Sequence, residues 1–130
     1  MDIDKTVPFQ IPNVSHGLQT ASGLLKLGED GLALEFEVKD SLVGVLKSGV
    51  REVDIPYSKL ESIEFEKGWF SGKIILEGTS MRVFEDLPGV DVATCTLKVK
   101  HGDRREAEKL ISRARLALSE HRLNEMGDAD

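Results

Sequence analysis

The sequence predicts a mainly β (α+β) domain in which seven short antiparallel strands precede one amphipathic C-terminal helix. Apolar and polar residues alternate through several short segments, which is typical of strands with one buried face. Turn residues such as Gly, Pro and Asp separate these segments. After residue 100 the apolar spacing changes to the period of a helix. At 130 residues the chain is expected to form one domain that needs neither disulfides nor metal to fold.

The domain is predicted to span residues 18–126, between an extended N-terminal arm (1–17) and a short acidic tail (127–130). The arm reads MDIDKTVPFQIPNVSHG, and its Asp and Pro residues interrupt any regular pattern. Phe9 and Ile11 are its isolated apolar residues. We expect this arm to lie extended on the domain.

The first half of the domain contains three predicted strands. GLLKLGEDG supplies one strand and a hairpin turn. In GLALEFEVK, residues 31–39, the apolar side chains alternate with polar ones, so this strand has one wet face. VREVDIP ends at Pro56, which cannot donate a hydrogen bond within a sheet.

Four further strands are predicted in the second half: ESIEFEK (61–67), GKIILEG (72–78), MRVF (81–84) and ATCTLKVK (93–100). Seven short strands separated by turn signals indicate a sandwich or a barrel. The helix follows, with Asp103 and Glu106 placed as in a capping box. Its length of roughly 30 Å would let it lie across the open end of a small barrel.

A local motif accompanies this order of elements. VDIPYSKLESIEFEKG, residues 53–68, resembles the third-to-fourth strand region of bacterial PH-like and GRAM-like domains of the pleckstrin-homology (PH) superfold. In those domains a strand closes on Ile-Pro, here Ile55-Pro56, and a short turn follows. A Leu/Ile-x-x-Ile step, here Leu60 and Ile63, then opens the next strand.

The resemblance covers about residues 18–123 and implies a seven-stranded antiparallel PH-like barrel closed by the C-terminal helix. The superfold hosts binders of lipids, peptides and proteins, so it implies no single function. The first hairpin departs from the lipid-binding members, because it carries Glu29 and Asp30 where those members carry basic residues. We therefore expect no phosphoinositide binding of the kind those members show.

Composition limits the cellular compartment and the classes of partner that are expected for this protein. The formal net charge of −6 disfavours nucleic acid, because a uniformly acidic chain repels phosphate backbones and anionic membranes unless a local basic patch overrides the repulsion. The single cysteine excludes an intrachain disulfide and fits a reducing compartment. The N-terminus lacks the pattern of a signal peptide and no apolar stretch approaches a membrane span, so a cytoplasmic protein is predicted.

No pattern in the sequence indicates catalysis. The histidines, His16, His101 and His121, are scattered and form no metal-ligand pair. Cys95 lies on the apolar phase of its strand, where an inert core thiol is expected. No glycine-rich phosphate loop is present. We predict no enzyme activity, no cofactor and no metal.

Two apolar features are candidate partner-binding sites. Trp69 and Phe70 stand between Gly68 and Gly72, where a turn is expected; strict alternation would point Trp69 inward and Phe70 outward. We expect the pair to cap the barrel end with at least one ring partly exposed, as an anchor for a partner; the alternative is ordinary packing. The connection 41–49 contributes Leu42, Val43, Val45 and Leu46, either as an exposed docking tip or as a strand that continues past a bulge.

A basic cluster lies where the last strand meets the helix. It comprises Lys98, Lys100, Arg104, Arg105 and Lys109, with His101 among them. One interpretation is an anion-binding site near the helix start; the other is a solvated surface, because acidic residues interleave the cluster.

These features favour a non-enzymatic interaction module that binds a protein partner or self-associates as a homo-oligomer. The alternative function is binding to a membrane surface or an anionic headgroup through the basic strand–helix junction.

Overall fold

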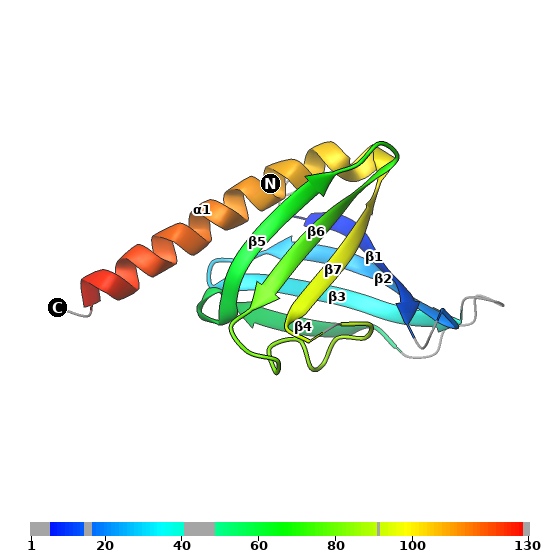
Figure 1. Ribbon diagram of the computed structural model, residues 1–130, viewed down its shortest axis with the longest axis horizontal. Helices are drawn as coiled ribbons and strands as arrows, with labels where there is room; N and C mark the ends of the chain where they lie inside the picture. The colour runs from blue at the N-terminus through cyan, green and yellow to red at the C-terminus, as the bar shows by residue number, and fades with distance from the viewer. Residues whose placement is uncertain (1–5, 15–16, 41–48, 91, 129–130) are drawn as a thin grey trace.

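The computed structural model describes residues 6–14, 17–40, 49–90 and 92–128, and it consists of one antiparallel sheet and a long helix (Figure 1). The strands are β1 (Thr6–Val14), β2 (Gln19–Leu27), β3 (Gly31–Asp40), β4 (Arg51–Pro56), β5 (Leu60–Lys67), β6 (Ser71–Gly78) and β7 (Thr94–Lys100). Two short 3-10 turns, η2 (Tyr57–Lys59) and η3 (His101–Asp103), precede β5 and the helix α1 (Arg104–Asp128). The mainly β class, the count of seven antiparallel strands and the C-terminal helix confirm the prediction, although one of the seven strands is not among those predicted.

The seven strands form a single sheet in the order β4-β3-β2-β1-β7-β6-β5. β1 joins its two halves, because it pairs with β2 along most of its length and with β7 at Gln10↔Lys98. β4 and β5 follow each other in the chain yet lie at opposite edges of the sheet. Among the described residues these two edges do not pair, so closure into a barrel is not confirmed.

The N-terminal segment differs from the predicted arm, because most of it forms β1. Val7, Phe9 and Ile11 are buried in alternation with more exposed residues, and Val14 is buried after a shift of register that follows Ile11. The prolines in this segment argued against a strand, because proline cannot donate a hydrogen bond within a sheet and is normally confined to strands with an unpaired edge. Here that condition is met, because β1 pairs with β7 at one position only.

The predicted strand MRVF is not a strand. Residues 81–84 lie in a connection of successive tight turns, in which the Val83 N–H donates to Ser80 O (3.4 Å) and the Leu87 N–H donates to Phe84 O (2.9 Å). Phe84 and Leu87 are buried in the core. The connection therefore covers one end of the core, and β1 supplies the seventh strand in place of MRVF.

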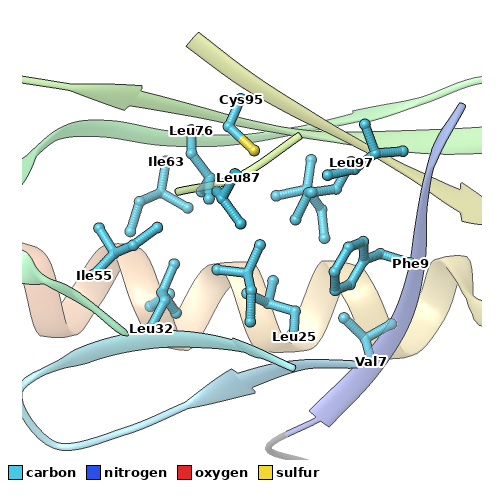
Figure 2. Packing of buried hydrophobic residues seen from close by; sticks show 14 of the residues in the cluster. Val7, Phe9, Leu25, Leu32, Ile55, Ile63, Leu76, Leu87, Cys95 and Leu97 are labelled. Atoms are coloured by element: carbon cyan, nitrogen blue, oxygen red, sulfur yellow. The ribbon is translucent and has the colours of Figure 1, made fainter. Parts of the chain in front are cut away.

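The core lies between the two halves of the bent sheet and is completed by α1 (Figure 2). Val7 and Leu25 from one half face Leu76 and Leu97 from the other, and Leu87 enters from the connection after β6. Among the described residues no polar or charged residue is buried. The core is thus held mainly by apolar contact, and Tyr57, which belongs to it, donates its hydroxyl to Gly28 O at 3.0 Å.

The helix α1 packs its apolar face on β5, η2 and neighbouring strands and then runs beyond the sheet (Figure 1). Its 25 residues correspond to about 37 Å. The face that the sequence predicted is buried at Ala107, Leu110, Ile111, Ala114 and Leu118. Near its end, Arg122 donates to the carbonyl oxygens of Leu60 and Glu61, and the ring of His121 lies 6.3 Å from that of Tyr57.

Candidate functional site

The turn between β5 and β6 presents two aromatic rings to solvent. The Gly68 N–H donates to Ser71 O (2.8 Å), which leaves Trp69 and Phe70 at the apex. These two residues are 89% and 86% exposed. Alternation alone would have turned Trp69 inward, but the strand ends before this residue and the turn carries both rings outward. We call this pair the aromatic tip.

Neither packing nor turn geometry accounts for the aromatic tip. Two-residue hairpin turns favour Gly, Asn and Asp, which tolerate a positive φ. Among the described residues other than glycine, the single positive φ belongs to Val92, so Trp69 and Phe70 meet no such requirement. Large aromatic side chains with so little contact are uncommon on a protein surface, and they indicate a binding surface.

Arg104, the first residue of α1, ties this turn to the strand–helix junction. Its Nη1 donates to Gly68 O at 2.6 Å, and its Nε donates to His101 O at 3.2 Å. A shallow depression lined by Lys67, Gly68, Trp69, His101 and Arg104 lies between the two segments. The aromatic tip is therefore held by a charged hydrogen bond from the helix start. The β5–β6 turn lies beside the beginning of α1 (Figure 1).

The basic cluster meets the aromatic tip at the same end of the molecule. Lys100 lies opposite Ser71 in the β6–β7 pairing, and Lys98 lies opposite Lys73. Arg105 follows Arg104 and is exposed. The two sites predicted separately are thus one surface, which we call the junction end and define as residues 67–71 together with 98–105. Lys109 is also exposed, one turn further along α1.

Charge at the junction end is only partly compensated. Within the described part of the chain, Lys67, Lys98, Lys100 and Arg105 form no ion pair. Lys73 and Lys98 face each other across β6 and β7. Like charges in such a cross-strand pair destabilise a sheet. The acidic residues Glu66, Asp103, Glu106 and Glu108 lie nearby, and Glu66 is opposite Lys73.

Two basic residues were not predicted as part of a site from the sequence: Lys67, which belongs to the junction end, and Lys73, which lies beside it. The missing signal was pairing, because only the antiparallel register of β5, β6 and β7 brings residues 67–73 beside residues 98–105. The other predicted apolar site, Leu42, Val43, Val45 and Leu46, lies outside the described residues.

A second hollow, which the sequence did not predict, lies on the outer face of the sheet beside the junction end. It has a volume of about 520 Å³ and is lined by parts of β1, β2, β3 and β7. Its lining carries both signs of charge: Glu35 and Glu37 come from β3, and Lys98, Lys100 and Asp103 come from the strand–helix junction. This mixture selects no single class of ligand.

Cys95 lies in β7 with its thiol in the core. Burial raises the pKa of this thiol to about 12, so it stays protonated at neutral pH and is not a nucleophile. Among the described residues no three His, Cys, Asp or Glu side chains gather as a metal site would require.

The raised pKa of Cys95 predicts a loss of stability in alkali. The folded state holds this proton up to about pH 12, whereas the unfolded thiol releases it near the ordinary cysteine pKa of 9.0. The contribution is complete below pH 9 and is lost as the pH rises from 9 toward 12. Denaturant titrations across this range should show a steeper decline for wild type than for Cys95→Ala; parallel declines would contradict the assignment.

Comparisons of the chain with protein-family models, curated proteins and solved structures find no match. Within the described residues, no helix combines the length and the apolar character needed to cross a membrane. The junction end is the feature from which a function can be inferred.

Proposed function

We propose that the protein is a non-enzymatic, cytoplasmic interaction module that docks onto its partner through the junction end. The observation that carries this proposal is the near-complete exposure of Trp69 and Phe70 on a turn that needs neither residue. Arg104 donates a hydrogen bond to the backbone of this turn, so the turn that carries the rings is already held to the helix start before binding.

We also propose a PH-like architecture for this module. The order of seven antiparallel strands and one C-terminal helix supports it. The motif 53–68 that carries the resemblance covers the end of β4 at Pro56, the short turn η2 and the strand β5, which supports the proposal. Exposed turns on a rigid sheet are frequent places for binding, because loops vary without disturbing the core.

Considered alone, the aromatic tip suits a protein partner or a second copy of this chain. Trp is enriched among the residues that dominate protein–protein binding energies. Considered with the cations of the junction end, it also suits an anionic membrane surface. This second candidate is favoured by one observation, the position of Lys100, Arg104 and Arg105 beside the turn.

Site-specific photo-crosslinking in the native host tests the docking role without assuming the partner. A photoreactive phenylalanine analogue replaces Phe70 in one variant and Met81 in the control, since both side chains are exposed and apolar. We expect adducts to protein or lipid from position 70 and none from position 81. Sedimentation of the purified protein reports self-association. A lack of any adduct from position 70, with a monomer in solution, would exclude the docking role.

Stability measurements separate a binding role of the aromatic tip from a structural one. Because both rings are exposed, Trp69→Ala/Phe70→Ala is expected to change the free energy of unfolding by no more than about 0.5 kcal/mol per residue. A buried aromatic residue would cost about 3–5 kcal/mol. Thermal unfolding followed by circular dichroism should show a nearly unchanged midpoint. A drop of that larger size would mean that the rings pack against the domain in solution.

A further inference from the structure

We propose that the surface bound by the junction end is an anionic lipid bilayer, into whose interfacial layer Trp69 and Phe70 insert; this inference rests on the proposed docking role. Three features of the junction end support it: the shape of the aromatic tip, the hydrogen bonds of its turn, and the charges around it.

The shape of the aromatic tip suits a soft, flat partner. Both rings stand at the apex of a two-residue turn, where they are neighbours and almost free of contacts within the chain. A protein partner would need a concave pocket shaped for two adjacent rings. A bilayer interface accepts any convex apolar tip, and Trp in particular prefers the depth of the lipid headgroups.

The polar groups at the base of the turn are already paired. The Gly68 N–H donates to Ser71 O, and Gly68 O accepts from Arg104 at 2.6 Å. When the turn moves from water into the lipid interface, these two backbone groups therefore keep their hydrogen-bond partners. The guanidinium of Arg104 stays at the base of the turn, near the level that lipid phosphates would occupy.

Cations flank the aromatic tip on both sides. Lys67 and Arg105 are exposed on the helix side, and Lys73, Lys98 and Lys100 are exposed on the outer face of β6 and β7. Basic residues next to apolar anchors are what anionic lipid surfaces attract. The chain as a whole carries a net charge of −6, so the same field repels its other surfaces and orients the junction end toward the lipid.

The cations are dispersed over two strands and a helix start and do not converge on one pocket. We therefore expect recognition of surface charge and not of one headgroup. Phosphatidylserine and phosphatidylglycerol should support binding equally, and phosphatidylcholine alone should support it poorly.

The chain provides its own reporter, because Trp69 is its single tryptophan. The protein is titrated with vesicles of phosphatidylcholine, with or without phosphatidylserine. We expect the Trp69 emission to shift to shorter wavelength with the anionic vesicles and to be quenched by brominated acyl chains. Added salt should weaken the binding, because the attraction is screened.

Two pairs of variants divide the binding into its apolar and charged parts. Phe70→Ala keeps the reporter and should lower vesicle affinity at least about tenfold, whereas the exposed control Met81→Ala should not change it. Lys100→Gln/Arg105→Gln should weaken binding several-fold. Lys59→Gln/Arg82→Gln removes the same charge from exposed residues outside the junction end and should leave the affinity near that of wild type.

The results distinguish this inference from the docking role on which it rests. If no vesicle shifts or quenches Trp69 while position 70 crosslinks to a protein, the bilayer inference is overturned and the docking role stands. If neither vesicles nor crosslinking engage the aromatic tip, both are overturned. Equal loss of affinity in the two charge variants would also overturn the inference, because net charge and not the junction end would then govern binding.

Discussion

Substitution of Leu110 by Ala is expected to lower the free energy of unfolding by about 2–5 kcal/mol. Leu110 lies on the buried face of α1 and is 0% exposed, so the shorter side chain leaves a cavity between the helix and the sheet. Because α1 packs against β5, η2 and β1, the cavity weakens the contact that completes the core. Chemical denaturation followed by circular dichroism measures the change.

The matched control is Leu116→Ala in the same helix. Leu116 is 61% exposed, so its truncation should change the free energy of unfolding by no more than about 0.5 kcal/mol. Helix propensity favours Ala over Leu only slightly, so the pair isolates packing. Equal effects at the two positions would show that the helix is not seated on the sheet as described.

The second large effect is expected from Gly23→Ala in β2. A Cβ at this position would lie 1.8 Å from Glu35 O and 2.6 Å from the Cα of Phe36, both backbone atoms of β3. β2 is hydrogen-bonded to β1 on one side and to β3 on the other, so it cannot shift away from one neighbour without disturbing the other. We expect a loss of about 1–3 kcal/mol or more.

Gly102→Ala is the control for this substitution. Nothing lies within 4 Å of a Cβ built at Gly102, and its φ is outside the left-handed region. Alanine there should be neutral or stabilise the fold by up to about 1 kcal/mol, because it restricts the unfolded chain. Unfolding midpoints that move together in the two variants would contradict the close approach of β2 and β3.

The elements predicted best were those whose local pattern agrees with their final environment. β3 alternates cleanly because one face meets the core and the other meets solvent. The buried face of α1 follows its apolar spacing for the same reason. The burial of Cys95 was also visible in the phase of its strand.

The elements predicted poorly depend on contacts that no local pattern encodes. β1 contains prolines that argue against a strand, and only its sparse pairing with β7 makes them tolerable. MRVF consists largely of residues that favour strands, yet it lies in a connection of turns, and Phe84 is buried in the core from that connection. The union of the aromatic tip with the basic cluster depends on the register of β6 and β7 and on one hydrogen bond from Arg104.

The place of β1 between β2 and β7 has a consequence for how the protein folds. The hairpins β1–β2–β3 can form from neighbouring parts of the chain, but the contact of Gln10 with Lys98 closes a loop that includes most of the sequence. Such distant pairing slows folding, because chain entropy is lost before the contact is gained. During synthesis on the ribosome, β1 cannot pair with β7 until β7 has been made. Until then the edge of β1 that faces β7 stays open to pairing with other chains.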